Sequence, residues 1–300
     1  MVEPQPGLRL EAAVNLTFYI VDVFAEEKYA GNQLAVVRGG AGLPDERLQK
    51  IALEMNDSET TFILSEEETE GGYHVRIFTP GDEVPFAGHP TLGTAYVIQH
   101  EILASPVERI ILKLKAGEIP VTFGEVLWMR QLPPTFGAIL ESALFARTLN
   151  LETADLDDRS PVQVVSTGLP ALIVPLRDLD ALRRCKVDWE RYTEVAGPGK
   201  NLYVFCPESH DDGPGDLSAR MFANDLGVPE DPATGSAAGC LAAYLLEHSY
   251  LGTDAVDVRV EQGYEIGRPS LLYLQAERDG EKIIVNVGGK VQMVARGELV

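Results

Sequence analysis

The chain has 300 residues, 45% of them hydrophobic, so it can bury a substantial core and its length suits two domains of ordinary size. Its formal net charge of −21 disfavours nucleic acid and anionic membrane surfaces as partners, because both would repel the protein. Three cysteines without the spacing of a metal site, Cys185, Cys206 and Cys240, indicate reduced thiols in a reducing compartment.

The N-terminal segment does not show the pattern of a secretory signal. Its first fifteen or so residues are polar and contain proline and glycine, so we expect a loose tail and not a secretory signal. No stretch approaches the roughly twenty apolar residues of a membrane span. We therefore expect a cytoplasmic protein, with no metal and no cofactor.

Short alternating runs predict strands in the first half of the chain. These runs cover residues 16–24, 34–38, 61–65, 73–79 and 110–114. Between them, an amphipathic helix is predicted over Asp45–Met55, introduced by Pro44. Residues 91–98 are apolar or small on most faces, which is typical of a fully enclosed helix.

The second half repeats this rhythm. Strands are predicted over residues 162–166, 171–176, 201–206, 217–222, 257–261, 270–277 and 282–287. A second enclosed helix is predicted over 237–246, and the charged stretch 152–159 is expected to be a solvated helix or loop. Two prolines at 133–134 place a boundary between domains 1–132 and 133–300, with the last strand free to return to the first domain.

The expected fold class is therefore α+β, with two pseudosymmetric domains that each curl a mixed sheet around a central helix. A repeated turn supports the symmetry. Residues 86–93 (FAGHPTLG) and 231–239 (DPATGSAAG) both open onto an apolar helical stretch, and Gly88 and Gly235 lie about half a chain length apart. Each turn is preceded by a similar tripeptide, RIF at 76–78 and RMF at 220–222.

Two such turns can hold an anion. The first N–H groups of a helix have no intrahelical partner and lie at the positive end of its macrodipole, and glycine lets a ligand approach them closely. Two helix ends that face each other across a cleft would bind a small carboxylate. The alternative is that both turns are only helix caps; the repetition, with unusual polar residues each time, favours the binding site.

Glu59 is the candidate acid/base group. It lies between the predicted helix 45–55 and the next strand, and the strand alternation gives it the same face as Thr61 and Ile63, which can point it inward. Burial would raise its pKa and suit it to move protons near neutral pH. The alternative is a surface glutamate near a turn.

His89 and Asp231 are the candidate polar partners in the two turns. His89 stands between Gly88 and Pro90 at a predicted helix start, although a histidine satisfied by local backbone is an alternative. Asp231 can simply cap the next helix, but Thr234 or Ser236 can also take that role. A surplus carboxylate would then be free to bond a substrate amine or hydroxyl.

Taken together, these motifs resemble the phenazine-biosynthesis, PhzF-like isomerase family over nearly the whole chain. The matching motifs are DVF at 22–24, GN at 31–32, SETTF at 58–62, RIFTP at 76–80, PFAGHP at 85–90, STG at 166–168 and EDPATGSA at 230–237. The resemblance implies the diaminopimelate-epimerase-like fold, an active site in the cleft between two domains, and a homodimer.

In that family, the glutamate that matches Glu59 is the acid/base that moves a proton between two carbons of a small cyclic amino acid. The resemblance also implies that residues matching His89, Asp231 and Ser236 surround the substrate. Asn32 matches a position that lines the cleft in the wider superfamily, but here the usual Gly-Asn-Pro is Gly-Asn-Gln. The expected substrate-binding set is completed by Gly88, Gly235 and Thr234.

The leading hypothesis is thus a cofactor-independent isomerase of a small carboxylate-bearing substrate. An amino-acid epimerase of the same fold is a second hypothesis, but Ala87 and Thr234 stand where those relatives carry their two cysteines, and Cys240 lies about one turn into the second helix. A non-catalytic module that binds small acids is a third. Glu59 argues against it, because another negative charge does not help to bind an anion.

Overall fold

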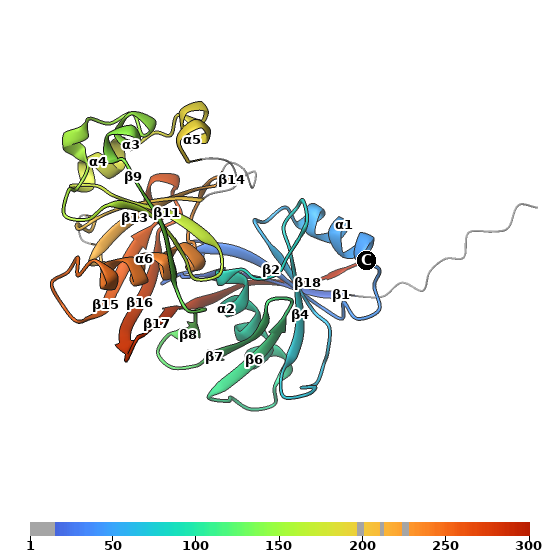
Figure 1. Ribbon diagram of the computed structural model, residues 1–300. Coiled ribbons are helices and arrows are strands. Elements are labelled where there is room, and N and C mark those ends of the chain that lie inside the picture. The colour runs from blue at the N-terminus through green and yellow to red at the C-terminus, as the bar shows by residue number, and fades with distance from the viewer. Residues whose placement is uncertain (1–15, 197–200, 211–212, 224–227) are drawn as a thin grey trace, which may run out of the picture.

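The computed structural model describes residues 16–196, 201–210, 213–223 and 228–300. The chain forms two halves, each around one buried helix (Figure 1). The expected loose tail, residues 1–15, lies outside the described residues. The first half contains β1 (Leu16–Val23), β2 (Asn32–Arg38), α1 (Asp45–Met55), β3 (Thr60–Ile63), β4 (Tyr73–Phe78), β5 (Glu83–Val84), α2 (Gly88–Val97), β6 (Arg109–Leu114), β7 (Gly117–Thr122) and β8 (Leu127–Arg130). A π-helical turn over Ile98–Ile102 extends α2.

The remaining elements belong to the second half, except for the last strand. They are β9 (Thr135–Leu140), α3 (Ser142–Thr148), β10 (Val162–Ser166), β11 (Pro170–Pro175), α4 (Leu179–Arg184), α5 (Trp189–Ala196), β12 (Asn201–Cys206), β13 (Leu217–Ala223), β14 (Val228–Asp231), α6 (Gly235–Glu247), β15 (Ala255–Gln262), β16 (Ser270–Asp279), β17 (Lys282–Gly289) and β18 (Val291–Leu299). None of the helices in the described part of the chain is long and apolar enough to cross a membrane.

Strand pairing follows the same order in both halves. In the first half it runs β18, β1, β2, β3, β4, β6, β7, β8, and in the second β9, β10, β11, β12, β13, β15, β16, β17. Each half has two parallel pairs, β2/β3 and β4/β6 in one and β11/β12 and β13/β15 in the other. In each half, a buried helix connects the strands of the second parallel pair: α2 connects β4 to β6, and α6 connects β13 to β15.

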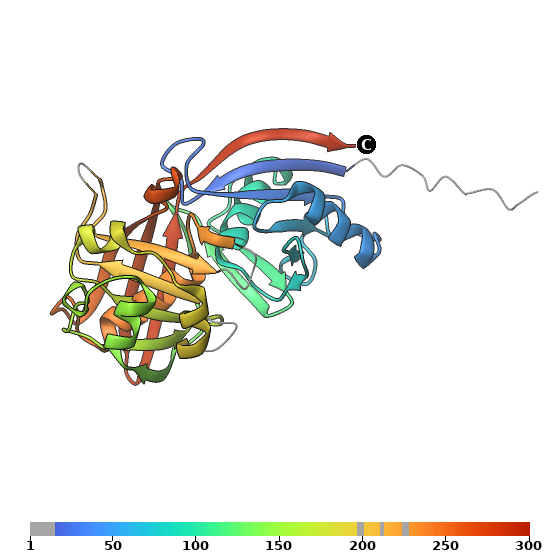
Figure 2. The ribbon, with the colours of Figure 1, turned by 90° about the horizontal axis from the view of Figure 1, so that it is seen from above.

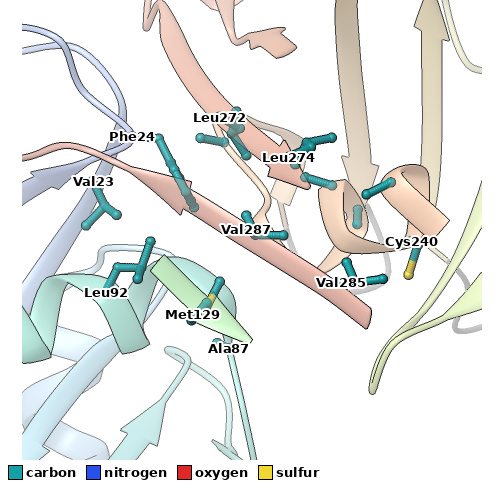
Figure 3. Close-up of a cluster of buried hydrophobic side chains, with 14 of the residues drawn as sticks. Val23, Phe24, Ala87, Leu92, Met129, Cys240, Leu272, Leu274, Val285 and Val287 are labelled. Carbon is teal, nitrogen blue, oxygen red and sulfur yellow. The ribbon is translucent and has the colours of Figure 1, made fainter. Parts of the chain in front are cut away.

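Two strand pairings join the halves. Strand β17 pairs with β8, and β18 leaves the second half to pair with β1, beside which it lies in Figure 2. One hydrophobic cluster also spans both halves. In Figure 3 it runs from Leu92 and Met129, past Val287 on β17, to Val285 and Cys240. The two buried helices are therefore packed into a shared core.

The repeat extends to an ion pair in each half. Arg76 on β4 makes two hydrogen bonds of 2.9 Å to the Glu83 carboxylate, and Arg220 on β13 makes the same two to Glu230 at 2.9 and 2.8 Å. Each guanidinium also lies over the phenylalanine two positions later in its strand. The paired arginines brace the strand that leads into each central helix.

The central helix α2 depends on a glycine for its position. A Cβ at Gly93 would lie 2.5 Å from Leu34 Cδ2 and 2.9 Å from Val23 Cγ2. Glycine costs helix propensity at an interior position, by about 1 kcal/mol relative to alanine. Here its lack of a side chain lets the helix pack directly on β1 and β2, where packing outweighs propensity.

The fold class predicted from the sequence is confirmed: each half is a mixed sheet curled around its own buried helix, and helix 45–55 is found with the predicted bounds. Pro44 is the residue before the first turn of that helix. The predicted strands shift by one to a few residues at their ends. The division after Leu132 falls between β8 and β9 and stays a prediction.

The sequence analysis missed the strands β5, β7, β8, β9, β14 and β18 and the short helices α3, α4 and α5. The expectation for residues 152–159 was wrong in part. A short helical turn spans Thr153–Asp155, but the carboxylate of Asp157 is buried and accepts hydrogen bonds from Arg159 and Tyr250. All three cysteines are free and buried.

Candidate active site

The N-termini of α2 and α6 meet at the centre of the molecule. A Cβ at Gly88 would lie 2.9 Å from both Gly235 Cα and the Ser236 backbone nitrogen. Ala87 and Thr234 precede the two helices in extended conformation, and neither helix end has a side-chain cap. The residues at the N-cap positions thus leave the first N–H groups uncapped, at the positive end of each helix dipole.

A pocket opens beside these two helix ends, with about 580 Å³ of space outside the protein atoms, part of it continuous with solvent. Both halves contribute to its lining, which consists of Ser58, Glu59, Thr79, Ala87, Gly88, His89, Leu169, Asn201, Met221, Ala223, Asp231, Thr234, Gly235 and Ser236. Every sequence-predicted site residue except Asn32 is in this set.

Glu59 and His89 face each other in the pocket. Glu59 Oε2 lies 3.5 Å from His89 Nε2, and that nitrogen is buried without a hydrogen-bond partner. Glu59 directly precedes β3, whose Thr61 hydroxyl accepts a hydrogen bond from the Thr94 hydroxyl of α2 at 2.8 Å. The strand alternation thus turns residues 59 and 61 toward α2, and the alternative of a surface glutamate is wrong.

Asn32 lies behind the lining and ties the two halves together. Its Nδ2 group donates to Asp231 Oδ1 at 3.0 Å and to the Ala233 carbonyl at 2.8 Å, and it lies 3.3 Å from His89 Nδ1. Its Oδ1 accepts a hydrogen bond from Ser58 at 3.4 Å. Asn32 is buried and begins β2, so its side chain positions groups of the site from both turns.

Asp231 ends β14 and does not cap α6. Its Oδ2 accepts a hydrogen bond from the Thr234 hydroxyl, and its Oδ1 accepts the bond from Asn32. No side chain caps α6, so neither Asp231, Thr234 nor Ser236 takes the capping role considered for it. Instead, Asp231 presents a buried carboxylate to the pocket.

The three titratable groups have pKa values that differ strongly from their usual ones. Burial, reinforced by the charge of Asp231, raises the pKa of Glu59 to about 8, although a hydrogen bond from Ser58 opposes this. Burial raises the pKa of Asp231 to about 6, against hydrogen bonds from Thr234 and Asn32 that favour its charged form. Burial lowers the pKa of His89 to about 3.

At neutral pH the free site therefore holds one negative charge. Asp231 is the carboxylate, Glu59 keeps its proton, and His89 is neutral. Two carboxyl groups whose pKa values are pushed apart in this way are typical of acid/base sites. A single charge next to two helix N-termini repels an incoming carboxylate less than two charges would.

The sequence reading missed the apolar wall of the pocket. Leu169, Met221 and Ala223 line it from the second half. The repeat contained a signal for them. Gly168 and Leu169 lie just before β11, as Gly31 lies just before β2, and Met221 belongs to the repeated RMF tripeptide. No group of three or more His, Cys, Asp or Glu in the described ranges could hold a metal ion.

Replacement of Gly88 by alanine is expected to destabilise the protein by about 1–3 kcal/mol, the usual cost of overpacking. The new Cβ would meet backbone atoms of Gly235 and Ser236, which cannot move aside as a side chain can. Urea unfolding would measure the change. Gly124→Ala is the control, because its Cβ would lie no closer than 3.6 Å to the nearest atom found, the Val126 carbonyl oxygen. Equal stability of the two variants would contradict the close apposition of the helices.

The chain is similar to known proteins over most of its length. Residues 21–297 match the model of the PhzC-PhzF family, described as phenazine biosynthesis-like protein. A trans-2,3-dihydro-3-hydroxyanthranilate isomerase from Pseudomonas aeruginosa is 34% identical over 287 residues, which cover 93% of this chain and 98% of that protein.

Solved structures extend the comparison. A PhzF-family phenazine biosynthesis protein from Bacillus anthracis superposes with a TM-score of 0.87 at 29% identity, covering 95% of this chain and 99% of that one. A probable proline racemase from Agrobacterium radiobacter shares the fold at a TM-score of 0.62 and 11% identity, covering 95% of this chain and 93% of that one. The chain thus shares its fold with that probable racemase, and it belongs to the PhzC-PhzF family of phenazine biosynthesis-like proteins.

Proposed function

We propose that this chain, an isomerase of the PhzF family, moves a proton between two carbons of a small carboxylate-bearing substrate without a cofactor. Glu59 takes the proton from one carbon and returns it to another, so the reaction changes neither the atoms nor the oxidation state of the substrate overall. One positioned base of suitable pKa can serve both steps.

The observation that carries this proposal is the pairing of Glu59 with Asp231 beside the N-termini of α2 and α6. A buried carboxyl with a pKa of about 8 is a strong base once ionised. The free N–H groups of the two helix ends are placed to bind the substrate carboxylate and to stabilise negative charge that develops on the deprotonated carbon. His89, Asp231 and Ser236 would surround the substrate.

The substrate proposed for the first trial is trans-2,3-dihydro-3-hydroxyanthranilate, the compound in the name of the Pseudomonas aeruginosa relative. It carries a carboxylate for the helix ends. The apolar wall formed by Leu169, Met221 and Ala223 suits the face of a small ring. The proposal also includes a homodimer, as the family resemblance implies, and sedimentation of the purified chain tests that part separately.

Two-thiol epimerisation is disfavoured by the residues at the two turns. Ala87 and Thr234 stand directly before the glycines, and neither side chain can act as a thiol base. The thiol of Cys240 does not line the pocket; it contacts the Thr167 hydroxyl at 3.7 Å and the Leu169 carbonyl at 3.5 Å.

The test is proton exchange in D₂O. Wild type and Glu59→Gln are incubated with trans-2,3-dihydro-3-hydroxyanthranilate and with a panel of small cyclic and acyclic amino acids, and NMR reads deuterium incorporation or rearrangement. Exchange by wild type alone supports the proposal. If neither protein exchanged or rearranged any compound, and ligands raised the thermal stability of both, the proposal would be overturned in favour of a binding module.

A further inference from the structure

Gln262 lies behind Asp231, outside the pocket, and is fully buried at the end of β15. Its side-chain amide spans the turn that leads into α6. Its Nε2 donates to the Asp231 carbonyl at 2.8 Å and to the Thr234 hydroxyl at 3.2 Å. Its Oε1 accepts from the Thr234 backbone N–H at 3.3 Å and from the Tyr203 hydroxyl at 3.1 Å.

Two of these contacts fix which way the amide points. A backbone carbonyl can only accept a hydrogen bond and a backbone N–H can only donate one. Because Gln262 meets the Asp231 carbonyl on one side and the Thr234 N–H on the other, rotating the amide by 180° would set donor against donor and acceptor against acceptor. The Nε2 group must therefore face the Thr234 hydroxyl.

This orientation in turn fixes the role of the Thr234 hydroxyl. Its oxygen accepts from Gln262, so its single proton is left for its other partner, Asp231 Oδ2. Asp231 Oδ1 already accepts from Asn32, whose Nδ2 is held by the Ala233 carbonyl. Both oxygens of Asp231 thus receive donated hydrogen bonds, an arrangement that suits a carboxylate and not a protonated acid.

We propose that Gln262 is a positioning residue that, through Thr234, holds Asp231 as the charged member of its pair with Glu59. The inference rests on the proposed function, because it assigns Gln262 a part in placing the proton on Glu59. Gln262 itself touches neither the pocket nor a reacting atom.

The groups that face Asp231 determine the effect of losing Gln262. They are Glu59 from the segment before β3, His89 of α2, which is linked through Asn32, and Tyr203 of β12. The charge of Asp231 raises the pKa values of Glu59 and Tyr203, while His89 is kept neutral by burial. Without Gln262 the Thr234 hydroxyl can turn away, and the pKa of Asp231 rises because its charged form loses a donated hydrogen bond.

The experiment compares Gln262→Leu and Thr234→Val with wild type. Both variants keep side-chain volume, and each breaks the donor chain at a different link. In the pH dependence of kcat/KM, we expect the lower midpoint, set by Asp231 near pH 6, to move up by at least half a pH unit in both variants. Carboxyl-detected ¹³C NMR of the free proteins follows the same titrations without any turnover. Gln163→Leu is the matched control, since Gln163 is a buried glutamine of β10 that bonds His248 and the Gly137 carbonyl.

Unchanged carboxyl titrations in both variants would overturn the inference, even if kcat or KM changed, because a merely structural role for Gln262 predicts that result. A shift in Thr234→Val alone would also overturn it, since Gln262 would then not act through Thr234. The proposed function fails by a different result, normal turnover by Glu59→Gln. If Gln262→Leu does not fold, Gln262→Met removes the same amide with an unbranched side chain and keeps the test decisive.

Discussion

Replacing Glu59 with glutamine is expected to lower kcat by about 10²- to 10⁴-fold, the usual contribution of a positioned acid/base group. Glutamine has the same shape and can bond Ser58, but it can neither accept nor return the substrate proton. Ligand affinity should change little, because at neutral pH Glu59 is uncharged in the free site. Initial rates measure the first effect and titration calorimetry the second.

The matched control is Glu54→Gln, on the exposed side of α1. It makes the same substitution at the surface and should leave both quantities unchanged. A Glu59→Gln variant that retained turnover within a few-fold would show that another group carries the proton. Loss of ligand binding together with turnover would instead assign Glu59 to binding.

The same group sets the expected pH dependence of the wild-type enzyme. If Glu59 must be ionised to act as the base, kcat/KM rises about tenfold per pH unit below the pKa of about 8 and levels off above it. Because Glu59 and Asp231 interact, the measured midpoint belongs to the pair. His89, with its pKa lowered to about 3, adds no step in this range.

Much of the fold could be predicted from the repeat in the sequence. The turns at Gly88 and Gly235 predicted two apposed central helices, and the tripeptides at 76–78 and 220–222 lie on the corresponding strands β4 and β13. The missed strand β9 carries mostly exposed residues, so it lacks the alternating pattern that marks a half-buried strand. Strand β18 also depends on a partner, β1, at the other end of the chain.

The site was predictable where chemistry concentrates polar residues in short motifs, as at Glu59, His89 and Asp231. Leu169 and Met221 look like ordinary core residues in sequence, because an apolar lining residue and a buried one have the same composition. Gln262 was missed for another reason. Its role depends on the polarity of hydrogen bonds to residues about thirty positions earlier, which no local pattern encodes.

Glu59→Gln is also expected to stabilise the protein at alkaline pH. The carboxyl of Glu59 has a pKa of about 8 when folded and about 4.5 when unfolded, so between these values the native state binds the extra proton. Stability then falls as pH rises, because the derivative with pH follows the protons bound by the unfolded minus the native state. The contribution of Glu59 to the free energy of unfolding is therefore largest below about pH 4.5, and it is lost as the pH rises through about 8.

Glutamine does not titrate, so the variant escapes this loss. At pH 4.5 and below, the two proteins should have nearly equal free energies of unfolding, and above pH 8 the variant should be more stable by up to about 5 kcal/mol, at about 1.4 kcal/mol per pKa unit. The 19% exposure of the Glu59 side chain makes that figure an upper limit. Asp231 and His89 titrate in both proteins and largely cancel in the difference.

Urea unfolding at pH 4.5, 6.5 and 8.5 measures this difference, with Glu54→Gln as the control for loss of a carboxylate. A stability gain that grows with pH in Glu59→Gln alone means that folding forces Glu59 to keep its proton, as a base buried against Asp231 must. A gain independent of pH would mean that Glu59 ionises as readily in the native protein as in the unfolded chain. The cleft would then hold two negative charges at neutral pH, and the helix ends would be needed to offset both before a carboxylate could bind.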